Sequence, residues 1–213
     1  MNKTSFFIFG GYSTAVEIAE TVALTNPEFE LWHVVADDDA QVGANRIKDK
    51  DLAEFAANRV GEKFFILSQS NCKIRSMFLA VALGLSLKPY TVIHPSAFIS
   101  KSARIGLGVY IAARAAVSSS ALIRDHSMLN MGMIFGHDAS CGEHFVGSPG
   151  SVIGGNASIG KRVFIGANSF IYQGLEVGDD VQVDAMTYVY KNIESKKLCA
   201  NRNLTVVNRF GMR

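Results

Sequence analysis

Residues 93–189 carry a hydrophobic pattern that repeats every six positions. The seventeen positions spaced by six begin at Ile93 and end at Val189, and fifteen of them are large and apolar; the two exceptions are Cys141 and Gly147. A strand repeats every two residues and a helix about every 3.6, so neither keeps this phase over so long a stretch. A six-residue repeat is typical of a parallel β-helix, and we predict that fold for residues 91–193.

In such a fold each hexad supplies one short strand and one turn, and three hexads complete a triangular coil. Side chains eighteen residues apart therefore stack on each other about 4.8 Å apart. A coil buries its apolar side chains only against neighbouring coils, so the array forms as a unit. The phase points Cys141 into the core. At Gly147 we expect the missing side chain to make room for the phenyl ring of Phe135 or Phe145, or the backbone to bend into a groove.

Residues 1–90 have another pattern, in which short apolar strands alternate with stretches of helical spacing. The expected strands are residues 5–9, 31–36 and 63–67, and the expected helices are residues 14–24, 51–58 and 75–85. This alternation predicts a small parallel sheet, a Rossmann-like α/β domain. The remaining residues 194–213 form a basic tail, which we expect to pack on the last coil or on a neighbouring subunit.

Ligands of parallel α/β sheets bind at the carboxyl ends of the strands. Gly10 and Gly11 follow the first predicted strand and precede a helix, so their backbone can approach an anion or a nucleotide. Asp37 and Asp38 follow the second strand and can accept hydrogen bonds from a ribose or a base. The dinucleotide-binding pattern GxGxxG is absent, and a tight turn with a solvated acidic loop is the alternative interpretation.

Composition excludes several functional classes. The 21 Lys and Arg against 19 Asp and Glu give a net charge of +2, without the basic field of a nucleic-acid-binding protein. Three scattered cysteines argue against a disulfide framework and favour a reducing, cytoplasmic compartment. No window approaches the ~20 apolar residues of a membrane span. The apolar fraction of 48% suggests that some surface is buried between subunits.

The spacing of the histidines sorts them into columns of the predicted prism. His126 and His144 are eighteen residues apart and share a column. His137 belongs to a different column, in which Gly155 follows it. A glycine in that position leaves room for a ligand to lie against the backbone, and Asp138 can hold the imidazole or raise its basicity. An exposed histidine without a function is the alternative.

Several motifs resemble a known family. His137-Asp138 follows Met131-Gly132 by six residues and precedes Ser148-Pro149-Gly150, which resembles the NHD…APG stretch of left-handed β-helix sugar acetyltransferases. More narrowly, the chain resembles the bacterial family of nucleotide-linked amino-sugar N-acetyltransferases and sialic acid O-acetyltransferases. The segments that carry this resemblance are Gly10-Gly11, Asp37-Asp38, Asn71-Cys72-Lys73-Ile74-Arg75 and Thr91-Val92-Ile93-His94-Pro95-Ser96-Ala97.

The resemblance implies a nucleotide-binding α/β domain joined to a left-handed parallel β-helix that forms a homotrimer. It implies that His137 is the general base and that Asp138 tunes it. It also implies an acetyl-CoA co-substrate, no metal, and a coenzyme site that includes Gly155, Val146, His144, Ala167 and Ala185. The acceptor, a nucleotide-linked sugar, would face Gly10, Gly11, Tyr12, Ser13, Asp37 and Asp38.

The sequence departs from the family pattern at three of these places. Gly136 stands where the family often has Asn, and Val146 stands where a second histidine contacts the coenzyme, with His144 two positions away. Tyr12 replaces a histidine in the glycine-rich turn near the acceptor sugar. These departures leave the identity of the acceptor open, including which nucleotide it carries.

The expected function is therefore direct acetyl transfer from acetyl-CoA to the amino group of a nucleotide-linked amino-deoxy sugar, in the synthesis of a surface polysaccharide or glycan. O-acetylation of a sialic acid-like sugar is the main alternative. A zinc enzyme similar to the β-helical carbonic anhydrases would use histidines from adjacent subunits, and a scaffold without catalytic activity is the last alternative.

Overall fold

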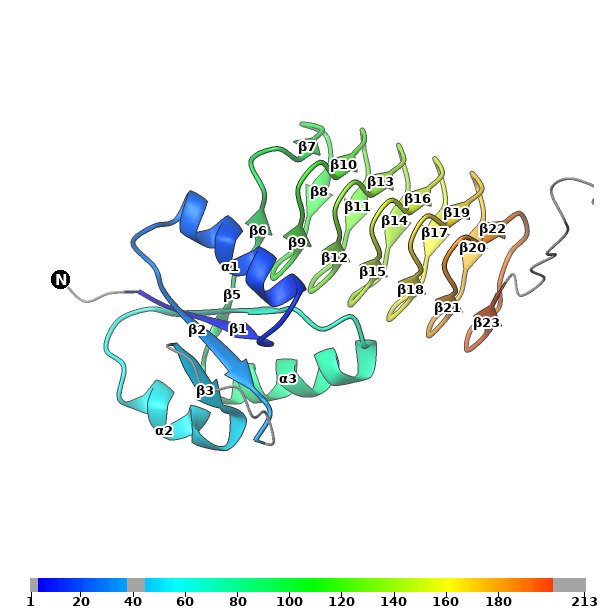
Figure 1. The fold of residues 1–213 in the computed structure, drawn as a ribbon. Helices are drawn as coiled ribbons and strands as arrows, with labels where there is room; N and C mark the ends of the chain where they lie inside the picture. The colour runs from blue at the N-terminus through cyan, green and yellow to red at the C-terminus, as the bar shows by residue number, and fades with distance from the viewer. Residues whose placement is uncertain (1–3, 38–44, 201–213) are drawn as a thin grey trace, which may run out of the picture.

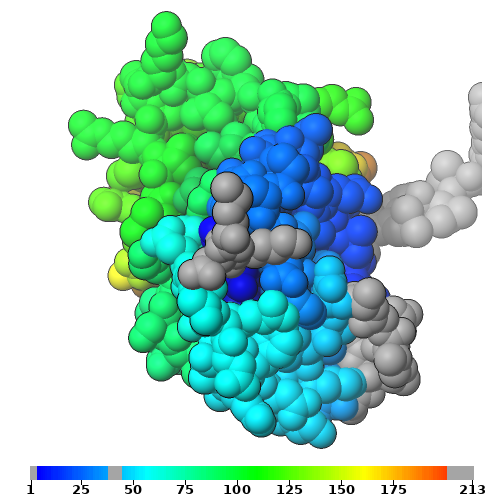
Figure 2. All heavy atoms as spheres, turned by 90° about the vertical axis from the view of Figure 1, so that its left-hand side faces the viewer, coloured from blue at the N-terminus to red at the C-terminus, as the bar shows by residue number. Residues whose placement is uncertain are grey.

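The computed structural model describes residues 4–37 and 45–200, which form an α/β domain and a three-sided prism of stacked coils (Figure 1). The α/β domain lies against the first coils of the prism, as the view from its own side shows (Figure 2). None of the helices in these two ranges has the length and apolar character that a membrane crossing requires.

The α/β domain is built on a five-stranded parallel sheet with the order β3-β2-β1-β4-β5. Its strands are β1 (Ser5–Phe9), β2 (Glu30–Val35), β3 (Arg46–Lys48), β4 (Lys63–Leu67) and β5 (Lys88–Pro89). Its helices are α1 (Thr14–Thr25), the 3₁₀ turn η1 (Asp49–Asp51), α2 (Leu52–Ala57) and α3 (Cys72–Gly84). The sequence pattern predicted the three longest strands and all three α-helices. It missed β3 and β5, because three- and two-residue strands carry no usable periodicity.

Helix α3 begins three residues before the predicted start. Asn71 caps it, since its Oδ1 accepts hydrogen bonds from the backbone N–H of Lys73 and Ile74 at 3.0 and 3.2 Å. An Asn at this position satisfies two N–H groups that have no partner inside the helix. The cap fixes the start of α3 beside the prism.

The prism has three parallel sheets, which we call faces 1, 2 and 3. Face 1 comprises β6 (Val92–Ile93), β9 (Tyr110–Ile111), β12 (Met128–Leu129), β15 (Val146–Gly147), β18 (Phe164–Ile165), β21 (Gln182–Val183) and β23 (Leu198–Cys199). Face 2 comprises β7 (Phe98–Ile99), β10 (Ala116–Val117), β13 (Ile134–Phe135), β16 (Val152–Ile153), β19 (Phe170–Ile171) and β22 (Tyr188–Val189). Face 3 comprises β8 (Arg104–Ile105), β11 (Leu122–Ile123), β14 (Ser140–Cys141), β17 (Ser158–Ile159) and β20 (Glu176–Val177).

The register confirms the eighteen-residue coil. Val117 pairs with Phe135, which pairs with Ile153, and the same step recurs on all three faces. The last coil is two residues shorter, because Val177 pairs with Ile193 and Val183 with Cys199. This arrangement fits a left-handed β-helix of hexapeptide repeats, as the sequence predicted.

The interior of the prism is filled by the repeating apolar residues, which form one continuous buried cluster. Cys141 is in this cluster, and burial raises the pKa of its thiol to about 12. The space at Gly147 is occupied chiefly by the side chain of Met133, since a Cβ on Gly147 would lie 2.1 Å from Met133 Sδ and 3.3 Å from a ring carbon of Phe145. The expectation of a phenyl ring was therefore wrong in part, because the methionine reaches the gap first.

The outward side of face 1 packs against the α/β domain. Val92, Tyr110, Met128 and Val146 form one buried cluster with residues of β1, β4 and α1, including Phe6, Ile8, Ile18 and Ile66. These side chains are at most 2% exposed. Burial of this apolar surface holds the two parts together.

A buried polar group lies beside this apolar joint. The guanidinium of Arg75 is fully buried; Nη1 donates to the carbonyl oxygens of Leu67 and Gln69 at 3.0 and 2.7 Å, and Nη2 donates to the carbonyl oxygen of His126. Burial lowers the pKa of Arg75 to about 10, so the side chain remains a cation at neutral pH. One side chain of α3 thus joins the end of β4 to a turn of the prism.

His126 and His144 form a stack at the same joint. Their ring centroids are 5.4 Å apart with an interplanar angle of 21°, and the ring of Phe65 stacks on His126 at 6.1 Å. Burial, and then the charge of Arg75, lower the pKa of His126; the same causes lower the pKa of His144 to about 4. The folded joint therefore favours two neutral imidazoles.

The repeat pattern would suggest an Ile at position 147, whereas the structure predicts that Gly147→Ile destabilises the prism. The added side chain would overlap Met133, and overpacking of a filled core costs about 1–3 kcal/mol of unfolding free energy. Urea unfolding of Gly147→Ile, Met133→Ala and the double variant measures this. We expect the double variant to be more stable than the sum of the single effects, and strict additivity would contradict the overlap.

The histidine stack predicts a loss of stability in mild acid. The pKa of His144 is about 4 in the folded state, against 6.5 for a histidine in the unfolded chain. Between pH 4 and 6.5 the unfolded state therefore binds a proton that the folded state does not. The contribution of neutral His144 to the free energy of unfolding is complete above pH 6.5, and it falls by roughly 3 kcal/mol as the pH drops to 4. Denaturant unfolding across this range should show a shallower pH dependence for His144→Gln than for the parent.

Candidate functional site

His137 and Asp138 occupy the turn between β13 and β14, on the edge where face 2 meets face 3. The imidazole is 57% exposed, and its Nδ1 lies 2.9 Å from Oδ2 of Asp138. A carboxylate only accepts hydrogen bonds, so Nδ1 carries the proton of the neutral ring. Nε2 is then left with its lone pair, which is the protonation state of a general base.

Gly155 lies on the next coil directly beside this ring. A Cβ on Gly155 would be 2.5 Å from Nε2 of His137, so any larger residue would displace the imidazole. The backbone keeps the coils in step, since the N–H of Asn156 donates to the carbonyl oxygen of His137 at 2.8 Å. The column predicted from the sequence is therefore present. The ring itself takes up part of the space above the glycine.

A second candidate region is a cavity of about 400 Å³ at the carboxyl ends of β1 and β4. It lies between the first turns of α1 and α3, where backbone N–H groups favour an anion. The predicted residues Gly10, Gly11, Tyr12 and Ser13 line it. Six further lining residues were not singled out from the sequence for this site: Thr14, Ser68, Gln69, Ser70, Asn71 and Ile74.

Three consecutive carbonyl groups of the glycine turn are each held by a different side chain. Phe9 O accepts from Ser68 Oγ at 2.6 Å, Gly10 O from His33 Nδ1 at 2.9 Å, and Gly11 O from Arg46 Nη2 at 2.8 Å. In a trans peptide the next N–H points opposite to the carbonyl, so these bonds also orient the amides that follow. The turn that precedes α1 is thereby fixed by β4, β2 and β3.

Arg46 also fixes the side chain that departs from the family pattern. Its guanidinium carbon lies 4.9 Å from the centroid of the Tyr12 ring, a cation–π distance. Tyr12 is 49% exposed at the rim of the cavity. No sequence pattern points to Arg46, because its strand has only three residues and its partners Tyr12 and Gly11 lie 34 and 35 positions away.

The two predicted aspartates are only partly covered by the described residues. Asp37 follows β2; its carbonyl oxygen accepts from Lys48 Nζ at 3.1 Å and its Oδ1 from the backbone N–H of Lys50 at 3.4 Å. Asp38 lies outside the described residues. Asp37 is not among the residues that line the cavity.

The residues predicted for the coenzyme lie on different edges of one prism. Gly155 is on the edge between faces 2 and 3, and Ala167 and Ala185 are in turns between faces 1 and 2. His144 is 7% exposed and Val146 is fully buried, both at the joint with the α/β domain. A single chain therefore does not bring these five residues together.

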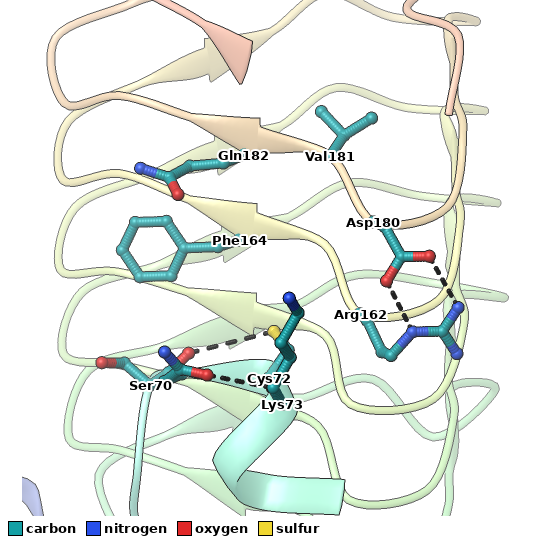
Figure 3. A pocket seen from close by; sticks show the side chains of 9 residues that line it. Ser70, Cys72, Lys73, Arg162, Phe164, Asp180, Val181 and Gln182 are labelled. Carbon is teal, nitrogen blue, oxygen red and sulfur yellow. Dashed lines mark hydrogen bonds and ion pairs between the residues drawn. The ribbon is translucent and has the colours of Figure 1, made fainter. Parts of the chain in front are cut away.

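A further cavity of about 440 Å³ adjoins the first one, and the two share Ser70 and Asn71. Figure 3 shows Cys72 and Lys73 rising from the start of α3 beside Phe164 and Gln182 of face 1. A bidentate ion pair also lines this cavity, in which Arg162 Nε and Nη2 donate to the carboxylate of Asp180 at 2.6 and 2.8 Å. Arg162 holds the pKa of Asp180 below its usual range.

The described residues contain no cluster of three or more His, Cys, Asp or Glu side chains that could hold a metal ion. His126 and His144 are stacked in the joint, and His137 lies on another edge. The three histidines considered for a zinc site do not converge in one chain.

His137 and the α/β cavity lie on opposite sides of the molecule. The α/β domain covers face 1, whereas His137 is on the edge between the other two faces (Figure 1). An acceptor bound in that cavity is thus separated from the imidazole of its own chain by the body of the prism.

Comparison with known proteins supports the fold of both the α/β domain and the prism. The model of the "Hexapeptide repeat of succinyl-transferase" matches residues 156–191. No curated protein sequence matches the chain significantly. The acetyltransferase domain of PglB from Neisseria gonorrhoeae is 23% identical, with a TM-score of 0.82 over 94% of this chain and 97% of that one.

Two further solved structures are similar over nearly their whole length. PerB from Caulobacter crescentus, solved in complex with CoA and GDP-perosamine, is 24% identical, with a TM-score of 0.84 over 92% of this chain and 94% of that one. WeeI from Acinetobacter baumannii is 15% identical, with a TM-score of 0.83 over 92% and 95%. The chain thus has the hexapeptide-repeat β-helix fold of these three structures, which is the fold that its sequence motifs indicated.

Proposed function

We propose that this protein is an acetyltransferase that moves the acetyl group of acetyl-CoA to the amino group of a nucleotide-linked amino sugar. The observation that carries the proposal is the exposed His137–Asp138 pair seated against Gly155, with Nε2 free to accept a proton. An exposed base with a free ring nitrogen can take the proton that an amine loses when it attacks a thioester.

The similar structures support the choice of substrates. PerB was solved with CoA and GDP-perosamine, and the PglB domain was also solved with acetyl coenzyme A. The strand order of the N-terminal sheet is that of doubly wound, Rossmann-like dinucleotide-binding sheets, and its carboxyl end carries the cavity between two helix N-termini. We assign this cavity, with Gly10, Gly11, Tyr12 and Ser13, to the nucleotide of the acceptor. We place the reaction in the cytoplasm, since the three cysteines are all free.

The residues determine how the reaction proceeds. As the acceptor nitrogen attacks the thioester carbonyl carbon, a C–N bond forms and Nε2 of His137 takes the proton that the nitrogen loses. Collapse of the tetrahedral intermediate breaks the C–S bond, and the imidazolium of His137 returns its proton to the sulfur, so coenzyme A leaves as the free thiol. We infer direct transfer, because Cys141 is buried with a thiol pKa of about 12, and burial also raises the pKa of the Cys72 thiol, which makes both poor nucleophiles.

The active site forms between copies of the chain, as a homotrimer. Within one chain His137 and the α/β cavity are on opposite sides of the prism, so an acceptor held by one copy reaches the His137 of another. The outward side of face 2, next to His137, supports this arrangement. It exposes a column of apolar residues, namely Phe98 at 64%, Ile134 at 47%, Phe170 at 37% and Tyr188 at 54%.

Removal of the base tests the chemistry. We expect His137→Ala to lower kcat for acetyl transfer to a nucleotide-linked amino sugar by about 10²–10⁴, the usual contribution of general-base catalysis. Asp138→Asn should lower it less, because the imidazole stays in place. His94→Ala, which removes a histidine on another edge, is the control and should retain parental activity. Unchanged transfer by His137→Ala would contradict the proposal, and calorimetry should show that this variant still binds CoA.

Mixing two inactive variants tests whether the site is shared between copies. Ser70→Trp should block the α/β cavity from an exposed position, and His137→Ala removes the base. If one copy supplies each half, co-expressed trimers should recover a substantial fraction of parental activity through their intact sites. Activity no greater than that of the separate variants would contradict a site between copies, and light scattering reports the trimer itself.

A further inference from the structure

The loop between β4 and α3, residues 68–71, lines both cavities described above. Its position relative to the prism decides where a bound acceptor lies relative to any base carried by a prism edge. A displacement of 1 Å in such an arrangement can cost about a hundredfold in rate. The contacts that fix this loop are therefore functional contacts.

Arg75 provides the polar contact between this loop and the prism. Nη1 donates to Leu67 O at 3.0 Å and Gln69 O at 2.7 Å, on either side of Ser68, while Nη2 donates to His126 O on the prism. The planar guanidinium thus sets the spacing and orientation of two chain segments at once. A further hydrogen bond between α3 and the prism runs from Cys72 Sγ to His144 O, at 3.5 Å.

The α/β domain and the prism do not need the buried guanidinium of Arg75 in order to stay together. Arg75 is fully buried, its three acceptors are neutral carbonyl groups, and its Nε has no partner among the described residues. Burial of a charge without a counter-ion opposes folding. The neighbouring apolar cluster already buries face 1 against β1, β4 and α1. A guanidinium at this place adds directional hydrogen bonds, which apolar packing does not provide.

We propose that Arg75 is a positioning residue for the nucleotide-linked acceptor: it locks the loop of residues 68–71 to the prism and so sets the geometry of the acceptor cavity. The inference rests on the proposed function, in that the cavity binds the nucleotide of the acceptor. Arg75 itself touches no substrate. It acts through the backbone of Leu67 and Gln69.

Two variants separate positioning from general stability. Arg75→Met keeps the apolar part of the side chain and removes all three hydrogen bonds. Arg75→Lys keeps the charge, but its single ammonium nitrogen replaces the planar guanidinium that bonds both the end of β4 and the prism. Arg59→Met is the matched control, since Arg59 is the partly buried partner of Glu30 and stacks on Trp32 and Phe55, away from both cavities.

The decisive readout is binding, measured by calorimetry on the full-length protein. For Arg75→Met we expect the Kd of the best-binding nucleoside diphosphate among UDP, GDP and dTDP to rise at least tenfold, while the Kd of CoA stays within twofold. With a nucleotide-linked amino sugar, the KM of the acceptor should rise and that of acetyl-CoA should not. Arg75→Lys should be intermediate, and Arg59→Met should bind both ligands as the parent does even if it unfolds at a lower temperature.

Several outcomes would overturn the inference. Parental nucleotide affinity in a folded Arg75→Met or Arg75→Lys protein would leave Arg75 with a purely structural role, as would an equal loss of CoA affinity. If Arg75→Met does not fold, Arg75→Lys alone decides by the same comparison. A parent protein that binds none of the three nucleotides would refute the proposed function as well, whereas a parent that binds one and variants that bind it equally would refute this inference alone.

Discussion

The backbone hydrogen bonds between coils eighteen residues apart are the constraint on which the rest of the structure depends. At the proposed catalytic edge, Asp138 N donates to Ser119 O at 2.9 Å and Asn156 N donates to His137 O at 2.8 Å. These bonds keep each turn above the preceding one, so side chains of one column must share a fixed spacing. The ladder therefore holds the ring of His137 directly against Gly155 of the next coil.

The three faces of one prism have different environments because different groups cover them. The outward residues of the first four strands of face 1 are buried by the α/β domain. Those of face 2 are apolar and partly or fully exposed, and those of face 3 include the exposed Arg104, Ser158 and Glu176. The inward residues are alike on all faces, since the same core must be filled. The faces and turns therefore differ in their outward side chains, which do not have to fill the common core.

The sequence predicted the features that follow from a fixed period and missed those that depend on tertiary contacts. The fold, the inward direction of Cys141 and the contact of His137 with Gly155 all follow from counting residues in steps of six and eighteen. The three side chains that hold the glycine turn do not, because His33 of β2, Arg46 of β3 and Ser68, which follows β4, are brought together only by the folded sheet. The contact of Met133 with Gly147 was missed for a related reason, since the period fixes the direction of a side chain and not how far a flexible one reaches.

The joint between the two parts shows why the edge with His137, and not the edge with His144, suits proton transfer. Both edges carry a histidine beside an acidic residue, Asp138 in one case and Glu143 in the other. At the joint, burial and the Arg75 cation lower the pKa of His144 to about 4, which makes it a poor proton acceptor. His137 is 57% exposed and bonded to a carboxylate, so water and substrates reach its free nitrogen. The α/β domain covers the first coils of face 1 and leaves the opposite edge open. In the proposed mechanism, an acceptor bound to that domain therefore meets the base of another copy.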